Sequence, residues 1–257
     1  MNKRSWQRRQ ILGAIIASMI LSLSGPAMAE EKFSSVWSGF STSLAGRSPE
    51  QRHNAALAGY ALNGIIIPPG GILSFNDQVK ARDTERGFVP APFYDAWGET
   101  SSAPGGGICQ LASALYNAAL LGGLKIVERH PHSRLVWHVP PGRDATISSW
   151  RKDLKVQNPF SHPLQLRITT DQRRLTVSFH ASREKDFQVE LLTEQTTLEP
   201  ETVIWRDTGK GTREQTGGQG LATITKRIIK KDGEITEEIL SQDVYPAPSR
   251  ILSEGGQ

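Results

Sequence analysis

The chain contains a single cysteine, so it can form no internal disulfide. A lone thiol in a protein of this length is either buried and inert or used chemically, and free cysteine is among the most buried residue types. The chain also lacks a phosphate-binding loop, because residues 105–107 are glycines without the lysine and serine that such a loop requires. No dinucleotide fingerprint follows a predicted strand. Nucleotide binding is therefore excluded, and the thiol of Cys109 becomes the residue to explain.

The sequence has no long hydrophobic run. Residues 11–23 are almost entirely apolar or small, but a transmembrane helix needs about 20 such residues. Four basic residues precede the run, and Ala27-Met28-Ala29 follows it as a small-x-small cleavage site. We therefore predict a signal peptide over 1–29 and export to the periplasm or the extracytoplasmic cell envelope. The route is Sec or, given Arg8-Arg9, twin-arginine, and membrane attachment would arise only from an uncleaved anchor.

Net charge is nearly absent once this leader is removed. The full chain has 30 basic and 26 acidic residues, and the leader holds four basic residues and no acidic one. The rest of the chain therefore carries 26 of each sign. No basic stripe interleaved with aromatic residues is present, so a nucleic-acid partner is not expected.

Two segments predict helices. Ser48-Pro49 with Gln51 forms a capping box before a helix that ends at Asn63-Gly64. From Ile108 to Leu121 apolar residues recur at helical spacing, and a pair of glycines follows. The helices precede most of the strands, which favours an α+β fold, with a cysteine-bearing helix packed on an antiparallel sheet.

Strands and loops fill most of the remaining chain. The segment 90–104, rich in Pro, Gly and Ser, predicts a long exposed loop. Alternation and turn residues predict strands over 125–129, 135–139, 143–147, 164–169, 175–181, 223–230 and 234–240, the last two joined through Asp232-Gly233. We expect four parts: a leader (1–29), a lead-in segment (30–47), a main domain (48–185) and a small β-rich module with a tail (186–257).

The surroundings of Cys109 suggest a reactive thiol. The glycines before it allow positive φ angles and close approach of another backbone. The helix that starts beside it directs free N–H groups and the positive end of its dipole toward the thiol. Such an environment lowers the pKa of a thiol and can stabilise an oxyanion, through N–H groups near Gly106, Gly107 and Gln110.

A nucleophilic cysteine needs a base and a group that orients the base. His130 and His132 follow Cys109 by about twenty residues, and Asp144 comes a dozen residues later. This order of cysteine, histidine and aspartate is that of papain-like and transglutaminase-like thiol enzymes, which is an analogy of topology alone. The sequence leaves open which histidine is the base.

Five separated motifs, in order, resemble the VanW domain. They are PGGILSFN (69–76), GGGICQ (105–110), LYNAA (115–119), ERHPHS (128–133) and GRDAT (142–146). The resemblance runs from 52 to 168. More weakly, residues 191–252 resemble the small glycine-containing β module that often follows VanW domains.

The resemblance implies a function in cell-wall metabolism. Some VanW domains are linked to L,D-transpeptidation, the joining of peptidoglycan stem peptides through a cysteine acyl-enzyme. It implies that Cys109 is the nucleophile, that His132 is the base and that Asp144 orients it, while the residues themselves leave His130 open as the base. Gly106, Gly107, Gln110 and Arg143 would bind the substrate or its oxyanion. No cofactor is expected.

Two alternatives remain open from the sequence. The chain could be a non-enzymatic module that binds peptidoglycan or another part of the cell envelope. It could instead bind a metal through the two histidines, Cys109 and Asp144, although their spacing matches no standard zinc motif. We therefore assign no metal ligands.

Overall fold

The structure is a computed structural model that describes residues 32–94, 100–148, 151–206 and 215–254. The signal peptide predicted over 1–29 lies outside these residues. Within them the arrangement is mixed and rich in antiparallel strands, with three α-helices, and the predicted α+β class is compatible with it. In the described part of the chain, no helix has the length and apolar character needed to cross a membrane.

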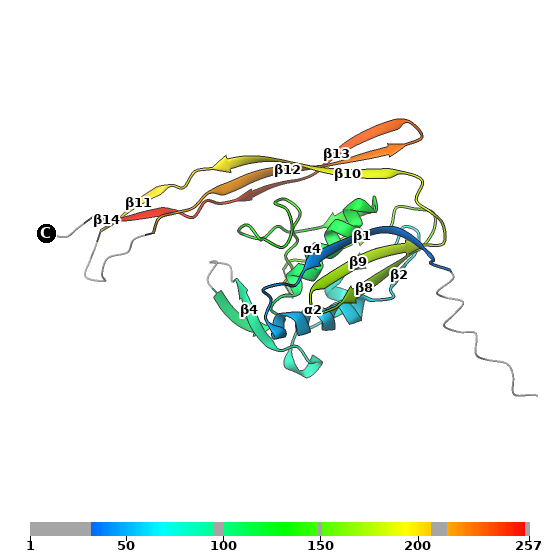
Figure 1. Ribbon diagram of the computed structural model, residues 1–257, viewed down its shortest axis with the longest axis horizontal. Helices are drawn as coiled ribbons and strands as arrows, with labels where there is room; N and C mark the ends of the chain where they lie inside the picture. The colour runs from blue at the N-terminus through cyan, green and yellow to red at the C-terminus, as the bar shows by residue number, and fades with distance from the viewer. Residues whose placement is uncertain (1–31, 95–99, 149–150, 207–214, 255–257) are drawn as a thin grey trace, which may run out of the picture.

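A four-stranded antiparallel sheet forms the centre of the molecule, in the order β1-β9-β8-β2 (Figure 1). Its strands are β1 (Ser35–Ser43), β2 (Ile66–Ile67), β8 (Leu164–Thr170) and β9 (Arg174–Ala181). In β8 and β9 buried residues alternate with more exposed ones, as expected for a sheet with one covered face. Leu166, Val177 and Phe179 are among the side chains that build the core.

Helices α2 (Pro49–Leu62) and α4 (Ile108–Leu121) pack against this sheet, α4 on β1 and β9 and α2 on β8. Twelve of the fourteen residues of α4 are buried, which is the pattern of a helix enclosed on all sides. Helix α4 is therefore the core element to which the rest of the fold is attached.

Smaller elements surround the two helices. A second sheet has the order β3-β7-β6 and contains β3 (Ile72–Ser74), β6 (Lys125–Glu128) and β7 (Lys155–Gln157). Helix α3 (Phe75–Val79) and a 3₁₀ turn (Thr84–Arg86) lead to a hairpin of β4 (Pro90–Tyr94) and β5 (Thr100–Pro104).

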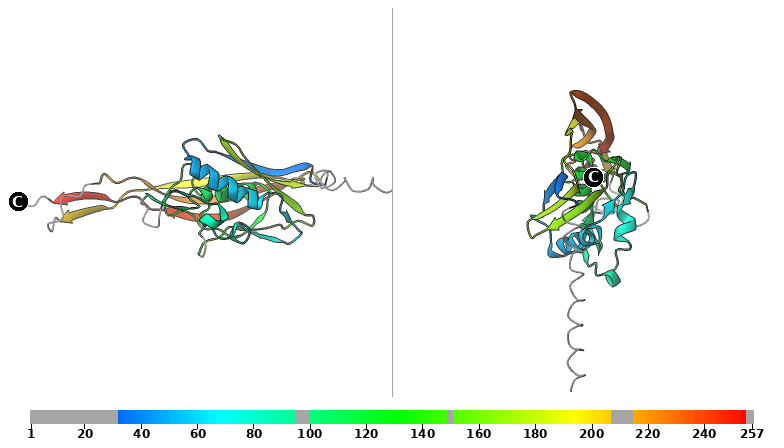
Figure 2. Two further views of the ribbon diagram at one scale, coloured as in Figure 1. Left: turned by 90° about the horizontal axis from the view of Figure 1, so that it is seen from below. Right: turned by 90° about the vertical axis from the view of Figure 1, so that its right-hand side faces the viewer.

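The last part of the chain forms an extended set of strands, here called the C-terminal arm (188–254). Its main sheet, β10-β12-β13, comprises β10 (Gln188–Leu198), β12 (Gly220–Lys231) and β13 (Glu234–Tyr245). Strands β11 (Thr202–Arg206) and β14 (Arg250–Glu254) pair in parallel at its far end. Figures 1 and 2 show the arm lying along the α4 side of the central sheet and projecting beyond it. The predicted Asp232-Gly233 turn is confirmed, with positive φ at both residues.

Three predictions from the sequence differ from the structure. The segment expected only as a lead-in (30–47) contains β1, whose Trp37 is buried in the core. The segment 90–104, expected as an exposed loop, contains the β4–β5 hairpin, and its residues 95–99 lie outside the described residues.

The strands expected over 135–139 and 143–147 are irregular instead. The reason lies in their hydrogen bonds. Side chains of α4 bind the backbone of 143–147, since Asn117 donates to the carbonyl of Arg143 and Ser113 both accepts from the N–H and donates to the carbonyl of Ala145. In 135–139 the hydroxyl of Thr42 donates to the carbonyl of His138. A segment whose polar groups are satisfied in this way does not need a neighbouring strand.

The start of α2 offers a test of a local signal. The Ser48 hydroxyl accepts from the N–H of Gln51, and the Gln51 side chain accepts from the N–H of Ser48. A Ser48→Ala change should lower the free energy of unfolding by about 1 kcal/mol, the usual cost of a lost N-cap. Urea denaturation measures it, with Ser182→Ala, at an exposed position outside any helix, as the control. Equal midpoints for the two variants would contradict this role for Ser48.

Candidate active site

Three glycines fix the start of α4 and hence the position of Cys109. Gly105 and Gly107 have φ angles of 90° and 96°, a region that favours glycine, and Gly107 is the N-cap of the helix. A Cβ on Gly106 would lie 2.2 Å from the carbonyl oxygen of Ala91 in β4. Cys109 therefore lies in the first turn of the helix, held against the β4–β5 hairpin.

The Cys109 thiol is partly buried. Its Sγ lies 3.6 Å from Oγ1 of Thr146 and 3.8 Å from the carbonyl oxygen of Ile147. Burial by itself raises the pKa of the thiol. A hydrogen bond and the positive charge of His132 outweigh this effect, with help from Thr146 and Ile147, and bring the pKa of Cys109 to about 7. About half of the thiol is consequently in the nucleophilic thiolate form at neutral pH.

His132 connects the thiol to a carboxylate. Its Nδ1 lies 2.5 Å from Oδ2 of Asp144, and its backbone N–H donates to the same oxygen at 2.7 Å. Nε2 is therefore the ring nitrogen left to face Cys109. Burial lowers the pKa of His132, but the hydrogen bond to Asp144 and the interaction with Cys109 raise it to about 9. Between pH 7 and 9 the pair is thus a thiolate beside an imidazolium.

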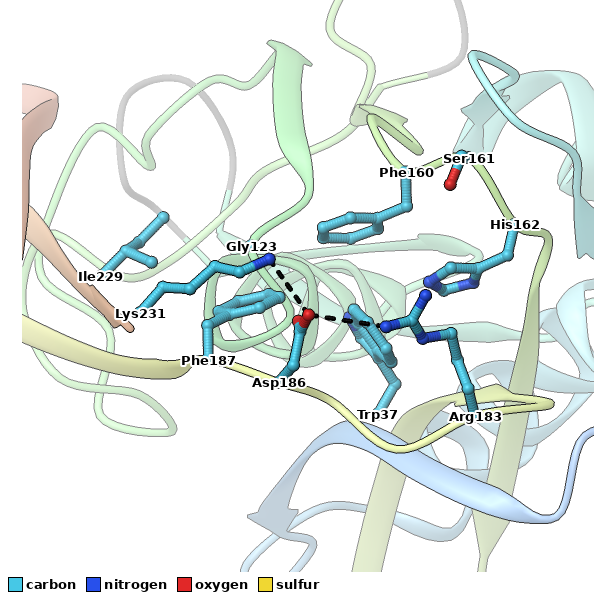
Figure 3. A pocket seen from close by; sticks show the side chains of 10 residues that line it. All are labelled: Trp37, Gly123, Phe160, Ser161, His162, Arg183, Asp186, Phe187, Ile229 and Lys231. Atoms are coloured by element: carbon cyan, nitrogen blue, oxygen red, sulfur yellow. Dashed lines mark hydrogen bonds and ion pairs between the residues drawn. The ribbon is translucent and has the colours of Figure 1, made fainter. Parts of the chain in front are cut away.

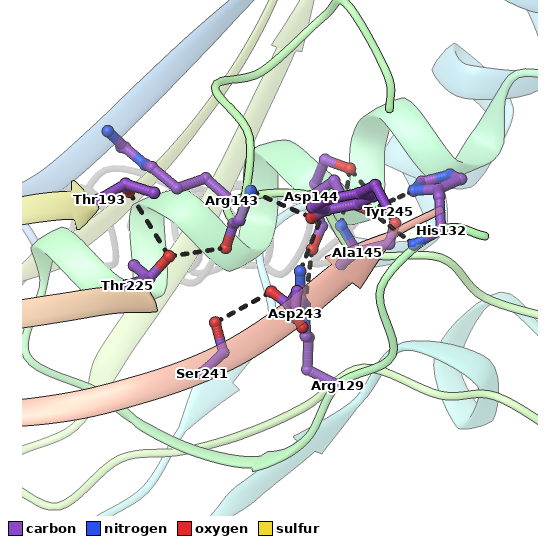
Figure 4. A network of polar contacts seen from close by, with 12 residues as sticks. Arg129, His132, Arg143, Asp144, Ala145, Thr193, Thr225, Ser241, Asp243 and Tyr245 are labelled. Atoms are coloured by element: carbon purple, nitrogen blue, oxygen red, sulfur yellow. Dashed lines mark hydrogen bonds and ion pairs between the residues drawn. The ribbon is translucent and has the colours of Figure 1, made fainter. Parts of the chain in front are cut away.

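Asp144 is 1% exposed and is surrounded by donors (Figure 4). His132 occupies Oδ2, while the hydroxyl of Tyr245 and Nη2 of Arg129, at 3.2 Å, occupy Oδ1. Burial raises the pKa of this carboxyl, but His132, Tyr245 and Arg129 together bring it to about 2. Asp144 is therefore ionised at every pH at which the thiol reacts.

The side chains of His130, Gln110 and Arg143 bind groups other than the thiol. His130 directs Nε2 to Oε1 of Glu128 at 3.0 Å, so it pairs with that carboxylate. The Gln110 amide donates to Oγ1 of Thr42 and to the carbonyl of Ser43. Of the two histidines that the sequence left open, the structure brings only His132 to Cys109 and Asp144.

Arg143 also points elsewhere. Its Nε donates to Oδ1 of Asn117 at 2.6 Å, and its guanidinium lies 5.5 Å from the centre of the Phe40 ring. Arg143 thus anchors the irregular segment to α4 instead of facing the thiol.

The backbone N–H groups at the start of α4 are unequally available. Those of Ile108 and Gln110 donate to the carbonyls of Gly105 and Gly107. Within the described residues, no backbone carbonyl accepts from the N–H of Gly107 or of Cys109. These two groups are backbone donors beside Cys109 in the sequence that an oxyanion could use.

Sequence reasoning missed several residues around the site. His138 lies beside His132, with 6.1 Å between ring centres, and burial and the charge of Arg47 lower its pKa to about 3, so it is neutral. Its Nδ1 lies 3.2 Å from Nη2 of Arg47, and its Nε2 lies 3.3 Å from the Ser113 hydroxyl. His138 looked like part of a strand, and nothing in its local sequence signals this position.

Two cationic side chains were also missed. The Arg47 guanidinium lies 4.4 Å over the ring of Trp137, which is 61% exposed, and its Nε donates to the side chain of Gln110. Arg82 packs its stem beside Gly105 and interacts electrostatically with Cys109. Arg82 therefore brings positive charge to the thiol, and Arg47 links the exposed ring of Trp137 to Gln110, the residue after Cys109.

Among the described residues, no three His, Cys, Asp or Glu side chains form a group that could hold a metal ion. His132 and Asp144 instead bind each other directly.

A cavity of about 300 Å³ lies at the other end of α4 from Cys109 (Figure 3). Aromatic rings of Trp37, Phe160 and Phe187 line it, and Lys231 and Arg183 pair with Asp186 at its edge. Gly123, which also lines it, follows the last turn of α4, so the cavity lies about 20 Å along the helix from Cys109. It is not part of the thiol site.

Comparison with known proteins gives a family match over residues 50–180, to the family described as VanW like protein. The chain is 38% identical over 130 residues to uncharacterized protein YoaR of Bacillus subtilis (strain 168), covering 51% of the chain and 43% of that protein. It is 31% identical over 140 residues to vancomycin B-type resistance protein VanW of Enterococcus faecalis (strain ATCC 700802 / V583), covering 51% of the chain and 49% of that protein. The chain thus spans about half the length of the curated relatives it matches.

Two solved structures resemble part of the chain. Each covers 28% of it at 21% identity: HP0197-G5, covered over 100% of its length with a TM-score of 0.19, and the IgA1 protease G5 domain, covered over 90% with a TM-score of 0.23. Scores this low carry no argument about fold or function.

Proposed function

Starting from the fact that this chain belongs to the VanW family, we propose that it is a cysteine-dependent acyltransferase that acts on peptidoglycan stem peptides. The observation that carries the proposal is the alignment of Cys109, His132 and Asp144, with the pKa of the thiol lowered and that of the imidazole raised. A nucleophile, a base and a group that orients the base are the components of acyl transfer through a covalent intermediate.

The first half-reaction would form a thioester. The Cys109 thiolate attacks a carbonyl carbon of the donor peptide, and the N–H groups of Gly107 and Cys109 receive the oxyanion. Collapse of the tetrahedral intermediate breaks the peptide C–N bond. The imidazolium of His132 gives its proton to the departing amine, which leaves neutral imidazole beside the thioester.

The second half-reaction would restore the thiolate. A primary amine of an acceptor stem peptide attacks the thioester carbonyl, and His132 takes the proton that the amine loses. A new amide forms, and the thiolate leaves beside the imidazolium. If water attacks in place of the amine, the outcome is hydrolysis.

The location of this substrate agrees with the leader predicted over 1–29, since peptidoglycan lies outside the cytoplasmic membrane. We propose that the chain works in the extracytoplasmic cell envelope. The exposed face of Trp137, with Arg47 stacked on it, would provide one wall for the peptide.

The intermediate itself provides the test. Incubation of the chain with a purified stem tetrapeptide at pH 8 should give an adduct with the mass of the acyl group, visible by intact-protein mass spectrometry. Cys109 is the only cysteine, so the thioester can form at one position. The adduct should disappear when an amine acceptor or hydroxylamine is added.

Cys109→Ser is the matched control, because it keeps the size of the side chain and removes the thiolate; it should give no thioester adduct. A wild-type chain that binds the peptide but never forms an adduct would instead favour the non-enzymatic binding module.

A further inference from the structure

We propose that the C-terminal arm is part of the catalytic machinery and that Tyr245 is a positioning residue, which holds the Asp144 carboxylate so that His132 faces Cys109. This inference rests on the function proposed above and deepens it. It assigns a role to a side chain that lies 101 residues from Asp144 in the sequence.

The two oxygens of Asp144 have separate partners. Among the described residues, Oδ2 is bound by the backbone N–H and by Nδ1 of His132. Oδ1 receives the Tyr245 hydroxyl and Nη2 of Arg129. With both ends of the carboxylate fixed, its plane cannot rotate, and the imidazole that it binds is held in one orientation.

Tyr245 has the properties that this role requires. It is 1% exposed at the end of β13, and its hydroxyl also accepts from the N–H of Gly142 at 3.0 Å. Burial and the negative charge of Asp144 raise the pKa of Tyr245 well above its ordinary value. The hydroxyl is therefore always protonated and always available as a donor to Oδ1.

Strand β13 also balances the buried charge. Arg129 joins Asp144 to Asp243, with 2.6 Å between Nη1 and Oδ1 of Asp243, and all three side chains are nearly inaccessible to solvent. The guanidinium lies 5.2 Å over the ring of Tyr116. Two carboxylates from opposite sides thus neutralise Arg129 and the imidazolium of His132, and buried charges need such partners.

The arm reaches Asp144 through close contact with the residues just before it. A Cβ on Gly142 would lie 2.5 Å from Oγ1 of Thr225 and 2.9 Å from Oγ1 of Thr223, both on β12. The Thr225 hydroxyl donates to the carbonyl of Gly142 at 3.2 Å. Figure 4 shows Thr225, Asp243 and Tyr245 of the arm gathered around the segment that contains Asp144. The arm therefore fixes the backbone of this segment as well as its carboxylate.

The test measures the rate at which iodoacetamide alkylates Cys109, as a function of pH, in the full chain. Tyr245→Phe keeps the buried ring and removes the hydroxyl. Its midpoint should move up by about 0.7 pH unit, the effect of one ordinary hydrogen bond, and because the wild-type thiol is about half ionised at pH 7 its rate there should fall roughly three-fold. Tyr60→Phe is the matched control, because it makes the same change at a side chain that is 84% exposed.

A double-mutant cycle separates positioning from general destabilisation. If Tyr245 acts through His132, the Tyr245→Phe effect should vanish in a His132→Ala background. An effect of equal size in both backgrounds, or a lowered Tm with unchanged alkylation, would overturn the inference.

Alkylation requires no peptide, so the two proposals can fail separately. Failure to form a thioester with a peptide, combined with the predicted cycle, would overturn the proposed function and support the role of Tyr245. If a thioester forms but the Tyr245→Phe and Tyr60→Phe profiles are equal, the proposed function is supported and the role of Tyr245 is overturned. If His132→Ala leaves the alkylation profile of Cys109 unchanged, both proposals are overturned.

Discussion

Replacing His132 with alanine should slow the alkylation of Cys109 at pH 7 by about ten-fold or more. In the wild type the pKa of the thiol is about 7, because the hydrogen bond and charge of His132 outweigh the effect of burial. Without His132 the burial remains, and the pKa should rise to at least the ordinary thiol value of about 8.5. Only a few per cent of the thiol is then ionised at pH 7, in place of about half.

The pH profile shows the sign of the effect. The wild-type rate should rise through pH 7 and level off, while the variant should begin to rise above pH 8 and reach a similar rate near pH 10. Loss of the His132 proton above pH 9 should not slow alkylation, but it should slow peptide transfer, which needs the imidazolium as an acid.

His130→Ala is the matched control, since it makes the same substitution two residues away in a side chain that pairs with Glu128. Its profile should overlay that of the wild type. His132→Asn, which keeps a donor for Asp144, guards against loss of folding. Equal profiles for the His130 and His132 variants would rule out a Cys109–His132 pair.

Replacing Gly106 with alanine should lower the free energy of unfolding by about 3 kcal/mol or more. The new Cβ would lie 2.2 Å from the carbonyl oxygen and 2.7 Å from the carbonyl carbon of Ala91, and 2.9 Å from the carbonyl oxygen of Pro92. All three contacts are with backbone, so no side chain can turn away, and the hairpin must separate from the start of α4. Thermal unfolding should show a Tm lower by roughly 6–12 °C.

Gly218→Ala is the control for this change. Its Cβ would meet only the Pro248 ring, at 3.5 Å, which is an ordinary contact. Its Tm should therefore stay within about 2 °C of the wild type. If Gly106→Ala unfolds at the wild-type temperature, the close packing of the hairpin on the cysteine turn is not present in solution.

Local signals in the sequence were sufficient to predict those elements whose structure is determined by contacts among neighbouring residues. The capping box at Ser48 and the periodicity after Ile108 predicted α2 and α4, and Asp232-Gly233 predicted the β12–β13 turn. Each of these depends on contacts within a few residues. The same holds for Cys109 at a helix start, because glycines precede it in the sequence.

The rest of the site was predicted only in part: the sequence named His130, His132 and Asp144 as candidates but not which histidine pairs with Cys109, because these contacts are remote in the sequence. Alternation suggested strands on either side of Pro140-Pro141, but side chains bind these backbones instead: Ser113 and Asn117 of α4 after the prolines, and Thr42 before them. The choice between His130 and His132 depends on that irregular backbone. Tyr245 reaches Asp144 across 101 residues, within a segment that reads as a separate module.

The carboxyl end of α4 depends on the same arm. Nη1 of Arg227, on β12, donates to the carbonyls of Leu120 and Leu124, which are 107 and 103 residues earlier in the chain. A positive charge at this end complements the helix dipole; Leu120 is in the last turn of α4, and Leu124 follows the helix. The C-terminal arm therefore contributes both to the capping of the helix that carries the thiol and to the positioning of Asp144. As the chain grows from its amino terminus, the nucleophile acquires its final surroundings near the end of synthesis, so a truncated product carries a cysteine without its complete site.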